Sequence, residues 1–320
     1  MDKFLRSEQL RTSIVKENLG QKIFGLSVGE PDFETPENIK VAAYRAIKNG
    51  DTKYTATDGI ISLKHAIKNK FLKDNNLSYE LNELIVCSGG KQVIFNAFMA
   101  TINPSDQVII PAPYWVSYPD ITRLCGGTPK IINTRIADGY KLTALALKKT
   151  INSNTKWLIL NSPTNPTGSV YSLKELNEIA QVVKMFPNVN ILSDDIYEHI
   201  TYENQPFLNI AQVEPSLKER TLILNGVSKS YSMTGWRLGY GAGSKRLIEA
   251  MIAIQSQSTS NATSISQHAA LEALSGPQHF IEKNKRIFEN RRNLLLDILR
   301  QSEDIQLLKP MGTFYAFPSI

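Results

Sequence analysis

Apolar side chains recur every three or four residues in several stretches of the chain, which is the spacing of one face of a helix. Thr35, Pro36 and Gly50 bound the first of these stretches as the predicted N-cap, first helical residue and terminator. Ser172 and Glu175 form a predicted capping box ahead of another stretch. The spacing predicts helices over residues 36–49, 60–73, 91–102, 172–186 and 277–302.

Short apolar runs of four residues alternate with helical stretches from residue 84 onward. They are LIVC (84–87), QVII (107–110), WLIL (157–160), VNIL (189–192) and TLIL (221–224). Continuous apolar runs are typical of strands that are buried on both faces of a mostly parallel sheet covered by helices. We therefore predict an α/β fold with a mostly parallel central sheet. Residues 305–320 are predicted to form a strand, a turn and a second strand, which would leave an apolar edge strand uncovered.

The composition is that of a folded globular protein. With 320 residues, of which 42% are hydrophobic, the chain can bury a substantial core and is long enough for about two domains. The net charge of +6 is spread along the sequence, which suits anionic small molecules at least as well as nucleic acid. No basic block interleaved with aromatic residues and no recognisable DNA-binding module is present, so nucleic acid is not an expected partner.

The cysteines and the N-terminal residues indicate a cellular compartment. Cys87 and Cys125 form no CxxC pair, so we predict neither a disulfide framework nor a metal site, and we expect a reduced compartment. No apolar segment of a signal peptide opens the sequence, and no stretch approaches the roughly 20 apolar residues of a membrane span. A soluble cytoplasmic protein without a membrane partner is therefore expected.

Polar residues follow each apolar run, at the position where ligands bind in open α/β sheets. Gly89 and Gly90 follow the first run and open a helix, so their backbone N–H groups and the helix dipole could receive an anion, with Lys91 beside them. Trp115 follows the second run and could stack on a flat ligand. Each feature also has a structural interpretation. The two glycines could simply form a tight strand-to-helix turn, and the tryptophan could belong to the core or to an interface.

The other three runs are followed by an amide-rich loop, a carboxylate and an amine. NSPTNPTG (161–168) has the prolines and the glycine of a tight turn, but its two asparagines indicate amides directed at a ligand. Asp194 follows the fourth run, where a carboxylate is either a helix N-cap or a functional group. Lys229 follows the fifth run, and a lone lysine is usually a solvated side chain.

Taken together, the five ends provide a set of groups that a single cofactor requires. Pyridoxal 5'-phosphate needs a phosphate cradle, a stacking partner, an acid at its pyridinium nitrogen and a lysine for the Schiff base. The combination therefore favours a pyridoxal-phosphate enzyme over a set of unrelated structural features.

Seven motifs and their order make this interpretation specific: GEPDF (29–33), YTATDGI (54–60), SGGKQ (88–92), PYWVSYP (113–119), NSPTNPTG (161–168), SDDIYEH (193–199) and SKSYSMTGWRLGY (228–240). They stand in the order seen in class I pyridoxal-phosphate aminotransferases, and the sequence resembles the bacterial aspartate aminotransferase branch of that family. The resemblance implies fold type I of the pyridoxal-phosphate-dependent transferases. It also implies a large cofactor-binding domain over residues 36–285 and a smaller α/β domain built from residues 1–35 and 286–320.

The resemblance further implies a role for each site residue. Lys229 would form the Schiff base and shuttle the substrate proton, and Asp194 would pair with the pyridinium nitrogen. Tyr197 and Asn165 would hydrogen-bond the ring 3-oxygen, and Trp115 would stack on the ring. The phosphate or its surroundings would be held by Gly89, Gly90, Lys91, Ser228 and Arg237. Tyr54 would reach the phosphate of the neighbouring subunit, because family members build each active site across a homodimer interface.

The implied function is a ping-pong aminotransferase for amino acids and 2-oxo acids, with aspartate and 2-oxoglutarate giving oxaloacetate and glutamate. Lys91 would meet the distal carboxylate of such a substrate, or it would only add to the positive field around the phosphate. Gly29 would contact the substrate through its backbone, and Trp115 and Asn165 would also line the substrate site. The alternatives are aromatic or prephenate-type substrates, a lyase reaction on the same fold, and a non-catalytic truncated form.

Two features depart from the family pattern. Family members continue beyond GTFYAFP into a region with an arginine for the substrate α-carboxylate, whereas the last arginine in this sequence is Arg300. The expectation is either a truncated sequence or a protein without that anchor. Asp195 stands where many relatives have glutamate, which is a conservative change beside Asp194.

Overall fold

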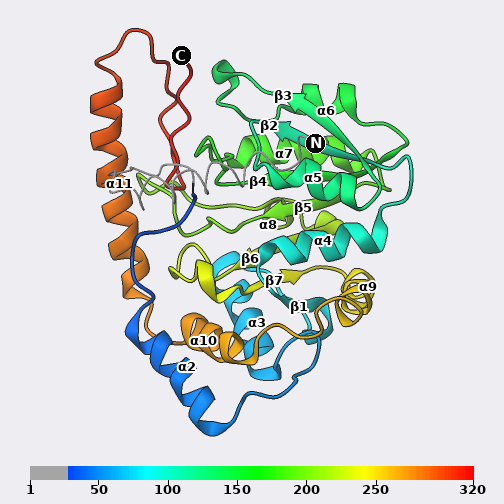
Figure 1. Ribbon diagram of the computed structural model, residues 1–320. Helices are drawn as coiled ribbons and strands as arrows, with labels where there is room; N and C mark the ends of the chain where they lie inside the picture. The colour runs from blue at the N-terminus through cyan, green and yellow to red at the C-terminus, as the bar shows by residue number, and fades with distance from the viewer. Residues whose placement is uncertain (1–27) are drawn as a thin grey trace, which may run out of the picture. The chain divides into compact units, whose positions relative to one another are not determined.

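Seven strands within residues 32–320 form one central sheet (Figure 1). Their order across the sheet is β1-β7-β6-β5-β4-β2-β3. The strands are β1 (Leu84–Cys87), β2 (Gln107–Ala112), β3 (Thr128–Asn133), β4 (Thr155–Asn161), β5 (Asn190–Asp194), β6 (Thr221–Gly226) and β7 (Gly239–Ala242). All neighbours from β3 to β6 pair in parallel, and β7 is antiparallel to both β6 and β1. The predicted α/β fold with a mostly parallel sheet is confirmed.

The structure is a computed structural model, and it describes residues 28–320. Contacts within the chain group the residues into two units, 1–31 and 32–320, and the sheet with its helices belongs to the second unit. The division into a large domain over residues 36–285 and a small domain from both termini stays a prediction.

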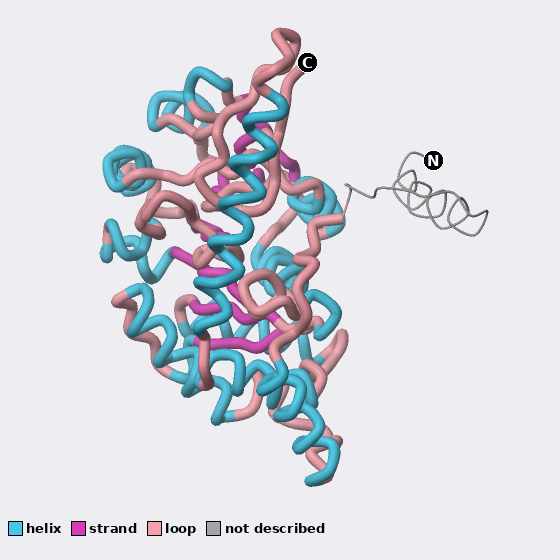
Figure 2. The backbone as a smooth tube through the Cα atoms, turned by 90° about the vertical axis from the view of Figure 1, so that its left-hand side faces the viewer, coloured by secondary structure: helices cyan, strands magenta, loops and turns pink. Residues whose placement is uncertain are grey.

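Helices lie on both faces of the sheet (Figure 2). They are α2 (Glu37–Asn49), α3 (Ile61–Asn75), α4 (Gly90–Thr101), α5 (Ser117–Leu124), α6 (Ala144–Thr150), α7 (Leu173–Lys184), α8 (Ile210–Val213), α9 (Lys245–Ser256), α10 (Ser264–Ser275) and α11 (His279–Leu299). None of the helices in the described part of the chain is both long and apolar enough to cross a membrane.

Each buried strand contributes side chains to two cores, because successive residues of a strand point to opposite faces. Ile85 and Cys87 of β1 pack in the core beneath α4, α5 and α9. Leu84 and Val86 pack on the other face, beneath α2, α3 and α10. The same face is covered farther along the sheet by α6, α7 and α8, over residues such as Ile191 of β5. Burial on both faces explains why these strands are continuous apolar runs.

The predicted helices are present, with ends that differ from the predicted ones by up to three residues. The difference at the start of α2 has a visible structural cause. The N-cap of α2 is Pro36, and Thr35 does not cap the helix. The Thr35 hydroxyl instead donates to the Ser232 carbonyl at 2.6 Å and accepts from Nε1 of Trp236 at 3.1 Å. The helix therefore begins one residue later than predicted, because a long-range contact uses the Thr35 hydroxyl.

The strand–turn–strand predicted over residues 305–320 is wrong. Within the described part of the chain, this segment makes isolated bridges and no regular strand, with Gln306 paired to Ser319 and Gly312 to Thr201. It runs beside α11 (Figure 1), where Nη1 of Arg292 donates to the Pro310 carbonyl at 2.9 Å. Gln306 and Ser319 exchange two backbone hydrogen bonds within the segment, but the N–H groups of residues 311–313 donate to the carbonyls of Gly168 and Ile200 in other loops, so no regular ladder forms.

Candidate active site

The residues predicted for the site lie at one edge of the sheet. β1, β2, β4, β5 and β6 all run in the same direction, so their carboxyl ends meet at that edge. The residues at or after these ends are Gly89, Gly90 and Lys91 for β1, Trp115 for β2, Asn165 for β4, Asp194 and Tyr197 for β5, and Ser228 and Lys229 for β6.

Asp194, the last residue of β5, is a buried carboxylate with 3% of its surface exposed. The Tyr118 hydroxyl donates to its Oδ2 at 2.7 Å, and the Ile196 N–H donates to its Oδ1 at 3.4 Å. Burial raises the pKa of Asp194 to about 6, although these two hydrogen bonds and the charge of Lys229 each lower it. The carboxyl group is therefore mostly ionised at neutral pH, although its pKa lies close to neutrality.

Replacing Tyr118 with phenylalanine is expected to raise the pKa of Asp194 above about 6, because a hydrogen bond to the charged form is lost. A hydrogen bond to a charged group contributes about 1.5–3 kcal/mol. A ¹³C NMR titration of aspartate carboxyls in the cofactor-free protein measures the shift, with the resonance assigned by its absence in Asp194→Asn. Tyr171→Phe is the matched control, since the Tyr171 hydroxyl is also buried but accepts from the Leu142 N–H. An unchanged titration in Tyr118→Phe would show that the hydroxyl does not stabilise the carboxylate.

Lys229 lies in an aromatic setting beside Asp194. Its Nζ is 5.8 Å from the ring centres of both Tyr197 and Phe314, and its charge lowers the pKa of Asp194. Burial raises the pKa of Tyr197 well above its usual value, so the phenol remains protonated. The Tyr197 hydroxyl is hydrogen-bonded by the Asn165 side chain. The ends of β4, β5 and β6 therefore meet around the lysine.

The turn between β1 and α4 forms an anion-binding arrangement with Arg237. Gly89 has a φ of +86°, and a Cβ at this position would lie 2.6 Å from Nη2 of Arg237, so a side chain does not fit. Gly90 is the first residue of α4, whose N-terminus carries partial positive charge. Arg237 also donates from Nη1 to the Thr234 carbonyl at 3.1 Å. The Gly89 N–H already donates to the Cys87 carbonyl at 2.8 Å, so the groups that an anion such as a phosphate could meet are the N-terminal N–H groups of α4 and the Arg237 guanidinium.

Lys91 and Trp115 connect this turn to the carboxylate. The Lys91 Nζ lies 5.0 Å from the Trp115 ring centre, and burial and the charge of Arg237 lower the pKa of Lys91. The Trp115 ring meets the Tyr118 ring edge to face, with 5.4 Å between centres. Because Tyr118 in turn contacts Asp194, a continuous series of contacts links the anion-binding turn to Asp194.

Three further predicted site residues are Tyr54, Ser228 and Gly29. Tyr54 is 91% exposed and is not part of this series of contacts. Ser228 is buried, and its carbonyl accepts a hydrogen bond from the Met233 N–H at 3.1 Å. Gly29 belongs to the unit formed by residues 1–31. The roles of all the predicted site residues stay predictions.

Three further residues of the site were not predicted from the sequence: Tyr118, Phe314 and Tyr315. Asn161 is one of the two asparagines predicted to direct an amide at a ligand, and it contacts two other site residues. The Asn161 side chain donates to the Asp194 carbonyl at 2.9 Å and accepts from the Asn165 N–H at 2.7 Å. Tyr118 falls inside the motif PYWVSYP, and Phe314 and Tyr315 fall inside GTFYAFP, so proximity to these motifs is the only sequence signal that points to them.

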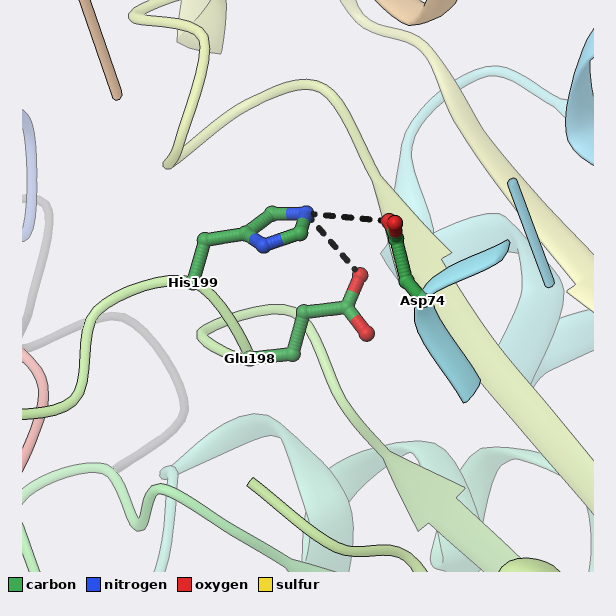
Figure 3. Close-up of side chains that lie close together, drawn as sticks. All are labelled: Asp74, Glu198 and His199. Atoms are coloured by element: carbon green, nitrogen blue, oxygen red, sulfur yellow. Dashed lines mark ion pairs between the residues drawn. The ribbon is translucent and has the colours of Figure 1, made fainter. Parts of the chain in front are cut away.

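A partly buried charged cluster, in which Glu198 is buried and Asp74 is exposed, supports the ends of β5 and β6. Asp74, Glu198 and His199 offer ligand atoms within 4.8 Å of one another, and Figure 3 shows Nε2 of His199 directed at both carboxylates. The Lys70 ammonium already forms an ion pair with Glu198 and lies 3.9 Å from Asp74, so a side chain supplies the positive charge of this cluster. Nδ2 of Asn225 donates to Glu198 at 2.7 Å, which ties the end of β6 to the loop after β5.

The sequence matches the family model described as "Aminotransferase class I and II" over residues 21–320. The chain belongs to this family. The probable aspartate/prephenate aminotransferase of Rickettsia felis is 55% identical over 310 residues, which are 95% of this chain and 76% of that protein.

Two solved structures show the likeness in three dimensions. The aspartate aminotransferase from Rhizobium meliloti superposes with a TM-score of 0.95 at 45% identity, covering 100% of this chain and 79% of that chain. The aspartate aminotransferase from Thermus thermophilus with maleate gives 0.92 at 38% identity, covering 96% of this chain and 80% of that chain. The predicted family, the predicted fold class and the prediction of an aminotransferase are confirmed.

Proposed function

We propose that this aminotransferase uses pyridoxal 5'-phosphate to transfer the amino group of aspartate to 2-oxoglutarate in a ping-pong reaction. The observation that carries this proposal is the series of contacts at the sheet edge, which links an anion-binding turn, an aromatic plane and a buried carboxylate, with the amine of Lys229 beside that carboxylate. Oxaloacetate and glutamate are the expected products.

The residues of the site fit the groups of the cofactor. The Gly89 turn is open to a phosphate because it carries no side chain and has Arg237 beside it. Oδ2 of Asp194 accepts from Tyr118, and among residues 28–320 Oδ1 receives a single long hydrogen bond, so the carboxylate retains capacity for a protonated ring nitrogen. The residues that would hold the cofactor are Lys229, Asp194, Tyr197, Asn165, Trp115, Gly89, Gly90, Lys91, Ser228 and Arg237.

The chain provides the acid–base groups of the reaction. When bound, the cofactor supplies an aldehyde that links to an amine and a ring that accepts electrons. Lys229 would carry that link, and once a substrate amine displaces it, its Nζ would move the proton at the substrate Cα. Asp194 would hold a negative charge at the ring nitrogen, and Tyr197, which remains protonated, would donate to the 3-oxygen.

The positive charge beside the anion-binding turn favours dicarboxylic substrates. Lys91 lies in the first turn of α4 and close to the charge of Arg237, so two cations share this end of the site. Two anionic groups, a phosphate and a substrate carboxylate, would balance them. Maleate, present in the structure of the Thermus thermophilus relative, is also a dicarboxylate.

Replacing Lys91 with alanine is expected to raise the KM for aspartate and 2-oxoglutarate by about 10–100-fold, because a charged contact of about 1.5–3 kcal/mol is lost. The KM for neutral and aromatic amino acids should stay within about threefold, since they carry no second carboxylate. Lys245→Ala, an exposed lysine on α9, is the matched control. An equal effect on all substrates, with weaker cofactor binding, would instead assign Lys91 to the phosphate.

A second candidate is the use of prephenate-type or aromatic oxo acids as amino acceptors. It is favoured by the 55% identity to a protein named a probable aspartate/prephenate aminotransferase. Assaying prephenate and 2-oxoglutarate as competing acceptors, with aspartate as the donor, ranks the two candidates.

A single half-reaction tests the proposal. Aspartate added without an oxo acid should change the cofactor absorption band and release one equivalent of oxaloacetate, and 2-oxoglutarate should restore the band. A lyase would form product continuously without an acceptor. A bound cofactor whose band responds to no amino acid would indicate a non-catalytic protein.

We also infer a homodimer with shared active sites. The exposure of Tyr54, at 91%, leaves its hydroxyl available to a neighbouring subunit, where it would reach the phosphate. Tyr44 and Ile61 are likewise large and exposed, as expected of an interface. Sedimentation equilibrium measures the oligomeric state.

A further inference from the structure

The Tyr197 hydroxyl has a second polar neighbour besides Asn165. The hydroxyl oxygens of Tyr197 and Tyr315 lie 2.8 Å apart, and either one can be the donor. Tyr197 is 2% exposed, so water does not substitute for these partners. A phenol donates one hydrogen and accepts up to two, so the direction of this bond decides where the Tyr197 hydrogen goes.

Tyr315 is held in place by the loops that carry the site. The Met311 N–H donates to the Gly168 carbonyl at 2.8 Å, in the loop that contains Asn165. The Thr313 N–H donates to the Ile200 carbonyl at 2.9 Å, in the segment that contains Tyr197. A Cβ at Gly312 would lie 2.7 Å from the same carbonyl, so the backbones pack too closely for a side chain. The segment over residues 310–315 is therefore part of the active-site wall.

Apolar rings surround the pair of phenols. Phe314 packs against Tyr197 with 5.7 Å between ring centres and against Tyr315 with 4.8 Å. Burial raises the pKa of both tyrosines, so the two hydroxyls keep both hydrogens at neutral pH. In such a setting a hydrogen bond is electrostatically stronger than in water, and neighbouring hydrogen bonds strengthen one another.

We propose that Tyr315 is a positioning residue that donates its hydroxyl hydrogen to Tyr197, so that the only hydrogen of Tyr197 is directed to the 3-oxygen of the cofactor. This inference rests on the proposed function. An anionic 3-oxygen can only accept, so Tyr197 must give it that hydrogen. The bond between the tyrosines then persists only with Tyr315 as donor, and this bond makes Tyr197 a stronger donor in turn.

The test is Tyr315→Phe, which keeps the ring and removes the hydroxyl. The midpoint of the pH titration of the cofactor absorption band should rise by about 0.1–0.7 pH unit. Without the Tyr315 hydroxyl, Tyr197 is a weaker donor, so more negative charge remains on the 3-oxygen. That charge would hold the proton that the 3-oxygen shares with Lys229 Nζ up to a higher pH. The Kd of the cofactor for the cofactor-free protein should rise by about 2–10-fold.

A double-mutant cycle separates this role from a structural one. Tyr197→Phe should shift the midpoint in the same direction and by more, and adding Tyr315→Phe to it should have no further effect, because Tyr315 acts only through Tyr197. Tyr202→Phe is the structural control, since the Tyr202 hydroxyl anchors the Thr313 carbonyl and its loss leaves the Tyr315 hydroxyl in place. It should lower the melting temperature and leave the midpoint unchanged.

Two results would overturn the inference while the proposed function stands. One is an unchanged midpoint in Tyr315→Phe of an enzyme that binds the cofactor and transaminates. The other is a shift of the midpoint by Tyr315→Phe that is as large in the Tyr197→Phe variant as in the wild type. A wild-type protein that binds no pyridoxal phosphate would instead overturn both.

Discussion

Lys229→Ala is expected to lower the rate of the aspartate half-reaction by about 10⁴-fold or more. The variant loses both the amine that links to the cofactor and the base that moves the substrate proton, and general acid–base catalysis alone contributes about 10²–10⁴-fold. Stopped-flow absorbance at saturating aspartate measures this rate. The variant should still bind the cofactor through the phosphate and ring contacts, because Arg237, Gly89 and Asp194 are unchanged.

Two controls show whether the loss is chemical. Lys229→Arg keeps a cation near the rings of Tyr197 and Phe314 but supplies no nucleophilic amine, so it should be as inactive as alanine. Borohydride reduction of the wild-type holoenzyme followed by peptide mass analysis should place the cofactor on Lys229. Recovery of the label on Lys91, the other lysine near the site, would reject the assignment.

The candidate site was predictable from the sequence because polar residues come directly after the apolar runs. Asp194 and Lys229 each stand at or just beyond the end of a short buried strand, and parallel strands bring their carboxyl ends to one edge. The identity of the run, its length and the polar residue after it are all local features. They do not depend on which distant residues pack together.

The apolar pattern does not predict β3 and β7, and each of these strands has a physical reason for its weak sequence signal. β3 is at the edge of the sheet and pairs only with β2, so half of its residues are exposed and its apolar content is low. β7 contains Gly239 and Gly241, which weaken a strand prediction. These glycines are needed for close packing, since a Cβ at Gly239 would clash with the backbone nitrogen of Gly90 and one at Gly241 would lie 3.0 Å from Val93.

The hydrogen-bond partners of the site residues could not be predicted either. Tyr118 and Asp194 are 76 residues apart, and Tyr197 and Tyr315 are 118 residues apart. Periodicity describes one element at a time, so it identifies which side chains are buried but not which ones meet. The same limit explains the strand–turn–strand wrongly predicted over residues 305–320, because residues 311–313 in the middle of the segment bond to two distant loops.

Asp194→Asn is expected to change stability and activity in opposite directions. Because burial raises the pKa of Asp194 from 3.8 to about 6, ionising the group in the folded protein costs about 3 kcal/mol. The folded state binds more protons than the unfolded state in this interval, so the cost is absent below pH 3.8 and fully present above pH 6. The cofactor-free variant should therefore be more stable than the wild type at about pH 7.5, and the difference should disappear near pH 4. Urea unfolding at the two pH values measures it.

The same substitution should lower the rate of the half-reaction by about 10²–10³-fold, because a neutral amide cannot stabilise a positive charge at the ring nitrogen. Asp195→Asn is the control one position away. Asp195 is equally buried, which raises its pKa to about 7, but its oxygens accept from Ser193 and Asn209. Its loss should change the half-reaction by less than about tenfold. If Asp195→Asn were as inactive as Asp194→Asn, the requirement would be for negative charge in the region and not for a carboxylate at the cofactor ring.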